Sequence, residues 1–282
     1  VVDESSYKVS IRSGFASFNI SAENAEDYPE LPDVNDGRPI LIPQNKLKEL
    51  ISGTIFAVAD NQARPIHNGV KFEVTNDAIT AVAVDGFRLA RRTYHPEEST
   101  ERELSFVVPA SGLKELEKIL TDSEEPAKFT LGKKHILYQV GDAILVCRLL
   151  EGDFLDYHAA IPRESSTNVV VNTRALIHSI ERTSLLISDR LRSPLRVDFG
   201  ESIIKMSCST SIGKAYDECC CSTTGNLLEM GFNNRFLLDA LKNVDTDMVR
   251  LELCGPLSPM KVLPLEGEHF LFLVLPMRLR AE

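Results

Sequence analysis

The sequence predicts an α+β protein with mainly antiparallel sheet, built from repeated domains. Short apolar strands outnumber helices and follow one another in runs, whereas a parallel α/β fold would alternate the two. The length of 282 residues suits about two domains, and the order of elements recurs along the chain. Strands are expected at 71–75, 78–84, 128–132, 144–150, 195–199, 203–209, 249–254 and 270–276.

Four segments have the spacing of amphipathic helices. Apolar residues recur every three or four positions in each, which gives one stripe for burial. Pro109 lies near the first turn of the second segment, and Asn172 or Thr173 is a plausible N-cap of the third. The fourth also opens on an asparagine. The predicted helices cover 43–57, 109–122, 172–188 and 233–244.

The same elements return at a fixed offset. The second helix begins at Pro109 and the fourth at Asn233, which is 124 residues later. An Asp-Tyr pair ahead of a proline also occurs twice, at Asp27 and at Asp156, 129 residues apart. A period this long indicates repeated domains rather than a solenoid, whose units have about 20–50 residues. We therefore expect the last strands of one unit at 1–37, a complete unit at 38–163 and a second complete unit at 164–282.

The composition is that of a globular protein. The net charge of −10 argues against binding nucleic acid with the whole surface, although it leaves room for a local basic face. No apolar run approaches the roughly 18 residues of a membrane span. The six cysteines include no C-x-x-C pair, and we interpret them as core-filling thiols in a reducing cytosol. The N-terminus lacks the features of a signal peptide and an initiator Met, so we expect a cytoplasmic fragment of a longer chain.

Sequence motifs of catalysis are missing. The chain contains no G-x-S-x-G, H-E-x-x-H, G-x-x-x-x-G-K-[ST] or G-x-G-x-x-G. One candidate catalytic pair remains, with Cys147 as the nucleophile and His158 as the base. We therefore expect a protein that is not an enzyme, with no catalytic residue, no metal site and no cofactor. The alternative from another class is a cytosolic repeat-domain hydrolase or scaffold without a DNA role.

Each predicted helix also carries basic residues on its flanks or on the side away from its apolar stripe. Residues four or seven positions apart share one face of a helix. Glu49, Glu115 and Glu181 on the same faces favour the alternative of an ordinary solvated surface. The basic residues are Lys46 and Lys48 on the first helix, Lys114 and Lys118 on the second, Arg174, His178 and Arg182 on the third, and Arg235 and Lys242 on the fourth.

Four stretches in this order carry a family resemblance: AVDGFRLA at 83–90, LLEGDFLDYHAAIP at 149–162, MGFNNRFLLDAL at 230–241 and VLPMRL at 274–279. Together they resemble the bacterial sliding clamp, the beta subunit of DNA polymerase III. The resemblance covers the whole chain. It implies the DNA clamp fold, with three similar domains in a full-length chain and two helices on antiparallel sheets in each. It further implies that two full-length chains close into a ring around duplex DNA.

In this family the helices line the hole of the ring, so the resemblance implies a DNA-facing role for the basic residues. A few Lys and Arg near phosphates give weak, salt-sensitive attraction that reads no base, and a closed ring is retained by topology. Arg64 corresponds to a position at the mouth of the ring that contacts DNA in relatives. The implied DNA-facing residues are Lys46, Lys48, Arg64, Lys114, Lys118, Arg174, Arg182, Arg235 and Lys242.

The resemblance also implies a groove for short linear motifs between the middle and last domains. Its partners in the family are the polymerase alpha subunit, the clamp loader, other polymerases and repair proteins. An apolar wall with an adaptable Met suits that role. The implied groove residues are Gly86, Phe87, Arg88, Leu89, Leu155, Ala159, Ala160, Asn233, Phe236, Leu257, Leu273, Val274, Leu275, Pro276, Met277, Arg278 and Leu279.

Several positions depart from the family pattern, and simpler interpretations remain open. Val84 stands where relatives often have Thr, Phe87 where they often have His or Tyr, and Ala159 and Pro259 replace polar or basic residues. These changes predict a more apolar groove. The stretch at 83–90 could equally be a strand with a tight Asp-Gly turn, and the last stretch a final strand ended by proline. The 282 residues alone are not expected to close a ring, because the family's dimer joins the first domain to the last.

Overall fold

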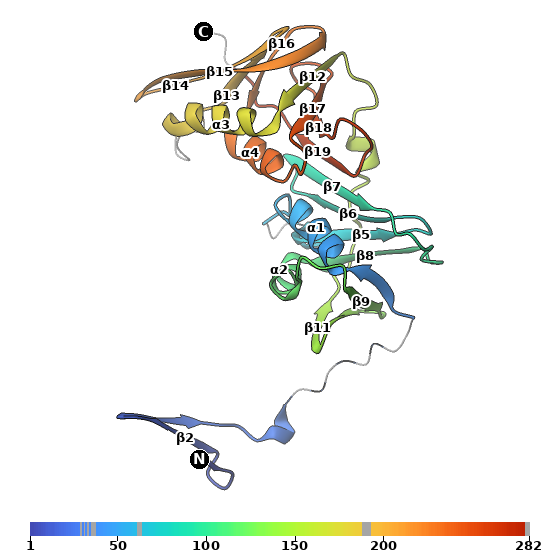
Figure 1. The fold of residues 1–282 in the computed structure, drawn as a ribbon, viewed down its shortest axis with the longest axis vertical. Helices are drawn as coiled ribbons and strands as arrows, with labels where there is room; N and C mark the ends of the chain where they lie inside the picture. Colours follow the sequence, from blue (N-terminus) through green and yellow to red (C-terminus); the bar gives the residue numbers. More distant parts are fainter. Residues whose placement is uncertain are drawn as a thin grey trace. The chain divides into compact units, whose positions relative to one another are not determined.

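The structure is a computed structural model that describes residues 1–28, 30, 32, 34, 38–60, 64–187 and 193–279. The chain divides into two compact units, residues 1–33 and residues 34–282, and each is described by itself. Figure 1 shows the order of the elements along the chain. Among the described residues, no helix is long and apolar enough to cross a membrane.

Unit 1 is a three-stranded antiparallel sheet without a core of its own. Its strands are β1 (Val2–Asp3), β2 (Lys8–Ser13) and β3 (Ala16–Ser21), in the order β1-β2-β3, and a short 3-10 turn η1 covers Ala25–Asp27. Phe15 and Phe18 are exposed, and none of the described residues of this unit is buried. So small a sheet gains little stability from its own contacts.

Unit 2 contains two successive sets of ten elements, which we name the middle repeat (β4–β11) and the last repeat (β12–β19). Each set runs strand, helix, four strands, helix, three strands. The middle repeat comprises β4 (Ile40–Pro43), α1 (Gln44–Ile55), β5 (Gly69–Val74), β6 (Ile79–Val84), β7 (Arg88–Tyr94), β8 (Leu104–Pro109), α2 (Ala110–Ile119), β9 (Pro126–Leu131), β10 (His135–Val140) and β11 (Ala143–Arg148). The last repeat comprises β12 (Thr167–Asn172), α3 (Thr173–Thr183), β13 (Leu195–Phe199), β14 (Ile203–Thr210), β15 (Gly213–Gly225), β16 (Leu228–Phe232), α4 (Asn234–Lys242), β17 (Met248–Leu253), β18 (Met260–Leu263) and β19 (Phe270–Val274).

The two repeats share one topology. Strand orders β11-β10-β9-β4 and β7-β6-β5-β8 in the middle repeat correspond to β19-β18-β17-β12 and β15-β14-β13-β16 in the last. All of these strand pairs are antiparallel. In the last repeat the long β15 also pairs with β12, which joins its two sheets. The predicted α+β fold of repeated domains, with two helices on antiparallel sheets in each, is therefore confirmed.

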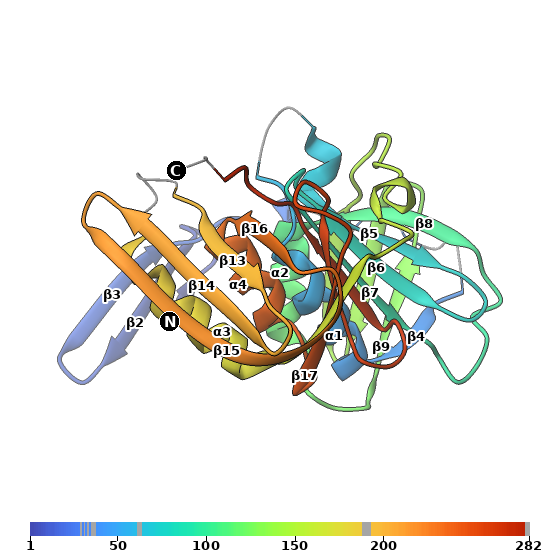
Figure 2. The same ribbon diagram turned by 90° about the horizontal axis from the view of Figure 1, so that it is seen from above.

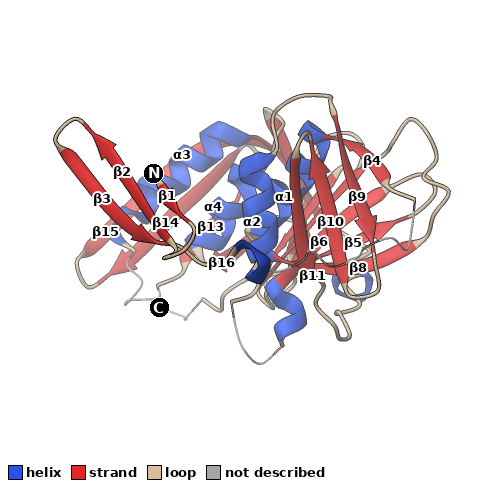
Figure 3. Cartoon of the chain, turned by 90° about the horizontal axis from the view of Figure 1, so that it is seen from below, coloured by secondary structure: helices blue, strands red, loops and turns tan. Residues whose placement is uncertain are grey.

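In the described part of unit 2, four helices form the other layer. In α1 the buried Leu47, Leu50 and Ile51 face the sheets, and the other helices bury an equivalent stripe. The helices pack as two pairs, α1 with α2 and α3 with α4. Figures 2 and 3 show them as one row, with the sheets around them.

The predicted helices were right in place but too long at their ends. Helix α1 stops at Ile55, two residues before the predicted end at position 57. Helix α3 stops at Thr183 and continues as a 3-10 turn, η4 (Ser184–Leu186), while position 188 lies outside the described residues. Asn172 is the N-cap of α3, because its side-chain oxygen accepts a hydrogen bond from the Ala175 amide at 2.9 Å.

Strands β7 and β19 join the two repeats into one sheet. They pair antiparallel, with Ala90 opposite Phe272 and Arg88 opposite Val274. On the helix side of this joint the Phe56 ring meets the Phe272 ring edge-on, with centroids 5.4 Å apart. The main apolar core continues through both repeats. The joint is therefore both hydrogen-bonded and packed, which places the ends of β7 and β19 in a fixed relation.

The connection between the repeats, residues 149–166, packs on the opposite face of that joint. Tyr157 is buried in a second apolar cluster with Leu89, Leu271 and Leu273. Its hydroxyl donates a hydrogen bond to Glu73 at 2.5 Å, and Lys71 pairs with the same carboxylate at 2.6 Å. Burial alone would raise the pKa of Glu73, but these two contacts outweigh it and hold the pKa below its ordinary value.

We predict that Tyr157→Phe lowers the free energy of unfolding by about 1 kcal/mol, because one hydrogen bond to a charged group is lost while Lys71 still pairs with Glu73. Thermal and urea unfolding measure the change. Since the Glu73 pKa is lowered on folding, its stabilisation is complete above the ordinary pKa of 4.5 and is lost as pH falls through the lowered value. The difference from wild type should therefore shrink in acid.

Tyr216→Phe is the matched control, because that hydroxyl contacts Glu218 on the exposed surface of β15. Equal destabilisation by both substitutions would show that the Tyr157 contact adds nothing specific.

Candidate functional site

A cavity of about 720 Å³ opens where the two repeats meet. Four parts of the chain form it: the turn between β6 and β7, Ile187 and Ser193 between η4 and β13, the start of α4, and the chain after β19. Its lining comprises Gly86, Phe87, Ile187, Ser193, Asn233, Asn234, Arg235, Phe236, Leu275, Pro276 and Met277. Most of these side chains are apolar, which suits an apolar ligand with a few polar anchors.

The turn from the middle repeat is held by its first residue, Asp85. One carboxylate oxygen of Asp85 accepts hydrogen bonds from the backbone amides of Phe87 and Arg88, at 2.9 and 3.0 Å. Gly86 has φ +92°, a conformation that side chains rarely adopt. The Asp-Gly sequence thus makes a tight turn that leaves the Phe87 ring 61% exposed over the cavity.

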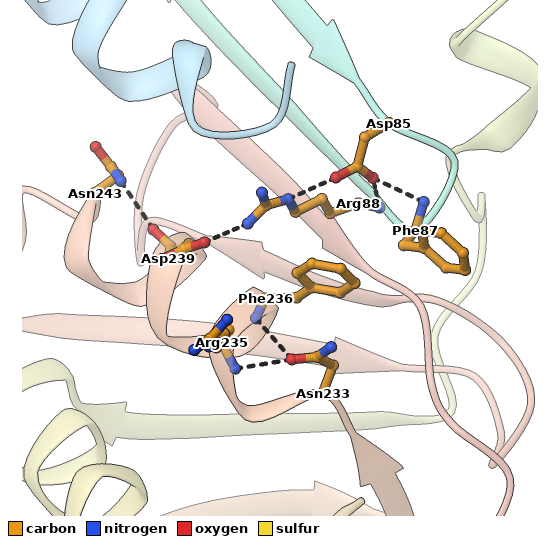
Figure 4. A network of polar contacts seen from close by, with 8 residues as sticks. All are labelled: Asp85, Phe87, Arg88, Asn233, Arg235, Phe236, Asp239 and Asn243. Carbon is orange, nitrogen blue, oxygen red and sulfur yellow. Dashed lines mark hydrogen bonds and ion pairs between the residues drawn. The ribbon is translucent and has the colours of Figure 1, made fainter. Parts of the chain in front are cut away.

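The opposite wall is the first turn of α4. Asn233 is the N-cap, and its side-chain oxygen accepts hydrogen bonds from the Arg235 and Phe236 amides. The Phe236 ring stacks against Phe87, with centroids 5.8 Å apart and planes 25° apart. Figure 4 shows this capped turn below Arg88 and Phe87. One aromatic ring from each repeat therefore forms the apolar surface of the cavity.

The chain after β19 closes the third side. The Leu275 amide donates to the Phe87 carbonyl at 2.9 Å, and the Met277 amide donates to the Gly231 carbonyl at 2.7 Å. Gly231 has no room for a side chain, because an added Cβ would lie 2.7 Å from both the Met277 oxygen and Leu279 Cδ2. The segment is thereby fixed to the middle repeat at one point and to β16 at the next.

The structure brings part of the predicted groove together around the cavity. Gly86, Phe87, Asn233, Phe236, Leu275, Pro276 and Met277 line it. Leu89, Leu273 and Val274 are buried in the joint instead. Leu155, Ala159, Ala160, Leu257 and Arg278 are exposed, Leu279 is half-buried, and none of these lines the cavity.

Sequence reasoning missed four residues of the lining: Ile187, Ser193, Asn234 and Arg235. Arg235 was expected to face DNA. Asn234 and Arg235 directly follow the N-cap Asn233, which had been predicted to line the groove. Their place in the first turn of the same helix could therefore have indicated that they line it too. Ile187 and Ser193 flank residues 188–192, which lie outside the described part of the chain, and nothing local marked them.

The other predicted DNA-facing residues, apart from Arg64 in the segment between α1 and β5, lie on the surface of the helices. Most of these helix residues are paired with acids. Lys46 pairs with Glu49 at 3.0 Å and Lys118 with Glu115 at 2.8 Å, within their own helices. Longer-range pairs join Lys48 to Asp122, Arg182 to Asp217 and Lys242 to Glu181.

For two of these acids, Asp217 and Glu181, the basic partner lowers the pKa of the carboxyl group. A hydrogen bond from Arg182 lowers the pKa of Asp217, and one from Lys242 lowers that of Glu181. Lys114 and Arg174 are exposed cations for which no described carboxylate serves as a partner. Arg64 is also exposed. The helix surface therefore carries few uncompensated positive charges.

The residues weighed for chemistry do not form a reactive site. Burial raises the pKa of Cys147, whose sulfur lies under α2 and would be 2.5 Å from a Cβ added at Gly112, so the thiol stays protonated. The His158 ring instead packs against Tyr157, with centroids 4.1 Å apart and the planes tilted by 32°. Among the described residues there is no group of three or more His, Cys, Asp or Glu that could hold a metal ion.

Comparison with known proteins agrees with this architecture. Residues 41–156 match the family model described as the DNA polymerase III beta subunit, central domain. Residues 158–278 match the DNA polymerase III beta subunit, C-terminal domain. The two matched regions correspond to the middle and last repeats.

Among curated proteins, the beta sliding clamp of Bacillus subtilis (strain 168) is 32% identical over 278 residues, covering 98% of this chain and 74% of that protein. The crystal structure of the Bacillus subtilis sliding clamp superposes with a TM-score of 0.93, at 31% identity, over 99% of this chain and 74% of that chain. That of the Pseudomonas aeruginosa beta subunit gives 0.90 at 29% identity, over 99% and 76%.

The fold is thus that of a DNA clamp built from repeated domains. The chain belongs to the beta sliding clamp family, the beta subunits of DNA polymerase III, which is a non-catalytic family.

We predict that Gly231→Ala displaces the segment after β19, because the added methyl group would collide with Met277 and Leu279. Overpacking of this kind costs about 1–3 kcal/mol, here confined to a chain end. Hydrogen exchange at the Met277 amide should accelerate while β13 and β14 stay protected. The control is Gly255→Ala, where nothing lies within 4 Å of the added Cβ. Unchanged exchange in Gly231→Ala would show that the segment is not held there.

Proposed function

We propose that this protein is a sliding clamp that gives processivity to the replicative polymerase. In this proposal it belongs to a ring that encircles duplex DNA and docks partners through the cavity between the repeats. Membership of the beta sliding clamp family supports the proposal. The observation that carries it is the apolar cavity at the joint, with one phenylalanine from each repeat stacked across it.

We propose that the ligand of this cavity is a short linear motif with apolar side chains, carried by the polymerase alpha subunit, the clamp loader, other polymerases or repair proteins. Residues from four distant parts of the chain surround a volume suited to a few side chains. Exposed aromatic rings such as Phe87 give large contact areas at little entropic cost. The polar side chains of the lining are Ser193 and, at the start of α4, Asn233, Asn234 and Arg235.

We propose that duplex DNA is held weakly by the helix surface. Five of the basic residues there already pair with acids, so only a few charges are left for phosphates. Few phosphate contacts mean low affinity and a shallow dependence on salt. Retention then comes from closure of a ring, as a clamp that slides requires.

Three further expectations belong to this proposal. The domain boundaries fall at 37/38 and 163/164. The protein acts in the cytoplasm. The full-length protein forms a homodimeric ring, whereas the 282 residues alone do not close one. Membership of a non-catalytic family removes the hydrolase alternative.

We predict that wild-type protein binds a fluorescent Gln-containing, Leu-rich peptide and that deletion of residues 275–282 abolishes binding without unfolding. Phe87→Ala should weaken binding by roughly tenfold, because it removes the exposed ring of the aromatic pair. Fluorescence anisotropy measures affinity, and circular dichroism monitors folding.

Leu257→Ala is the control, since Leu257 is exposed and lies outside the cavity lining. If the peptide binds the deletion variant as well as wild type, the assignment of this cavity is wrong.

We predict that Lys114→Glu with Arg174→Glu weakens binding to duplex DNA and reduces the slope of log affinity against log salt by about one per residue. These two cations have no described partner to compensate them. Anisotropy of a labelled duplex across a salt series measures both quantities. Lys133→Glu, in the exposed turn between β9 and β10, changes charge by the same amount per residue. An equal effect of that control would mean that net charge alone, not the helix surface, governs binding.

A further inference from the structure

Two arginines of β7 extend from the middle repeat to helix α4 of the last repeat. Arg88 and Arg92 are four residues apart, so their side chains leave the strand on the same face. That face is the one covered by the helices, because Ala90 between them lies in the main core with Phe272 opposite. The arginines stand at the two ends of the stretch of β7 that pairs with β19.

The Arg88 guanidinium is occupied by groups of the protein itself. Its Nε donates to Asp85 at 2.8 Å, and its Nη1 donates to Asp239 in the middle of α4. The guanidinium carbon lies 4.6 Å from the centroid of the Phe236 ring and 5.6 Å from that of Phe56. Figure 4 shows the side chain extended from the Asp85 turn to the helix. Arg88 thus links the turn that carries Phe87 to the helix that carries Phe236.

Arg92 reaches the other end of the same helix. Its Nη2 donates to the carbonyl of Asn243, the C-cap residue of α4, at 3.0 Å, and pairs with Asp245 at 3.0 Å. A cation at this end also interacts favourably with the helix dipole. His269 contacts Asp245 from the other side at 3.0 Å. Burial alone would raise the pKa of Asp245, but these contacts outweigh it and lower the pKa, so the carboxylate stays charged.

Helix α1 carries a glycine where Arg92 passes. A Cβ added at Gly53 would lie 2.3 Å from both Cδ and Nε of Arg92. Glycine inside a helix costs roughly 1 kcal/mol relative to alanine. The presence of glycine at this buried position of α1 leaves room for the Arg92 side chain to reach α4, and it lowers the intrinsic stability of α1.

We propose that Arg88 and Arg92 are positioning residues that fix α4 against β7 and thereby set the separation of Phe87 and Phe236 across the cavity. The inference rests on the proposed function insofar as that cavity is the ligand site. Arg88 was expected to be a residue of the ligand groove, and the proposal gives it a different role. Its guanidinium is paired with two carboxylates and covered by two rings, so it positions α4 rather than contacting the ligand.

Loss of either arginine should loosen α4 without unfolding the protein. The arginine side chains are 12% and 7% exposed, whereas Asp239 and Asp245 are more than 40% exposed, so either carboxylate stays hydrated when its arginine is lost. Asp85, the other partner of Arg88, is 13% exposed, but it keeps the hydrogen bonds from the backbone amides of residues 87 and 88. The large cost of an unpaired buried charge is thereby avoided. The backbone pairing of β7 with β19 involves neither guanidinium.

The test compares Arg88→Gln, Arg92→Gln and Asp239→Asn with the control Arg91→Gln. Arg91 lies on the same strand but on the opposite face, where it pairs with Glu268 across the same joint. Within the described residues it makes no hydrogen bond or ion pair to α4. Hydrogen exchange followed by mass spectrometry reports the opening of α4 directly, and α2 in the middle repeat is the internal reference. Peptide affinity is measured with the same Gln-containing, Leu-rich probe.

We expect exchange in residues 234–242 to accelerate in the three variants and to stay at the wild-type rate in Arg91→Gln. Peptide affinity should fall roughly tenfold, the effect of about 1.4 kcal/mol, again with no change in the control. Unchanged exchange in α4 would overturn the positioning role. Faster exchange with unchanged peptide affinity would overturn the claim that these arginines set the cavity. If wild-type protein does not bind the peptide, the proposed ligand site fails, while exchange in α4 still decides whether the arginines position the helix.

Discussion

The antiparallel pairing of β7 with β19 is the interaction on which the rest of unit 2 depends. It turns two repeats into one continuous sheet, and it brings the turn before β7 next to the chain that leaves β19. Apolar packing covers both faces: the phenylalanines beneath the helices on one side and the Tyr157 cluster on the other. Backbone pairing buried on both faces is costly to open, because each freed polar group would lack a partner. Because the joint resists opening, the cavity at its end has walls in a fixed relation to one another.

The charge arrangement reconciles an acidic protein with a proposed role around DNA. The chain carries a net charge of −10, yet its helices present basic residues outward. Acids from the same helices, from β15 and from the loop after α2 pair with most of them. Exposed pairs of this kind stabilise the fold little, but they reduce the field that a phosphate experiences. The result is a surface suited to weak contact rather than tight binding, in which closure of a ring would supply retention.

The candidate ligand site is assembled entirely from the ends of elements. A turn held by Asp85, a helix start capped by Asn233 and a chain end hydrogen-bonded to Gly231 meet within one cavity. Such ends are where backbone groups and side chains are left outside regular hydrogen bonding, so they are free to face a ligand. The positions of these ends are fixed by the strands and helices to which they belong. That is why residues remote from the cavity lining, such as Arg92 and Gly53, bear on its shape.

The sequence by itself determined the local elements and their repetition. Apolar spacing located all four helices, the asparagine caps were visible before α3 and α4, and the 124-residue offset showed that the order of elements recurs. These features are local, because periodicity and caps depend on a few neighbouring residues. Other features were decided only by the tertiary structure. Strand β15 joins both sheets of its repeat, and Arg235 lines the cavity. The Arg88 guanidinium pairs with Asp85 and Asp239. Each of these depends on contacts between residues far apart in the chain, and the pattern of one segment carries no information about which distant segment will lie beside it.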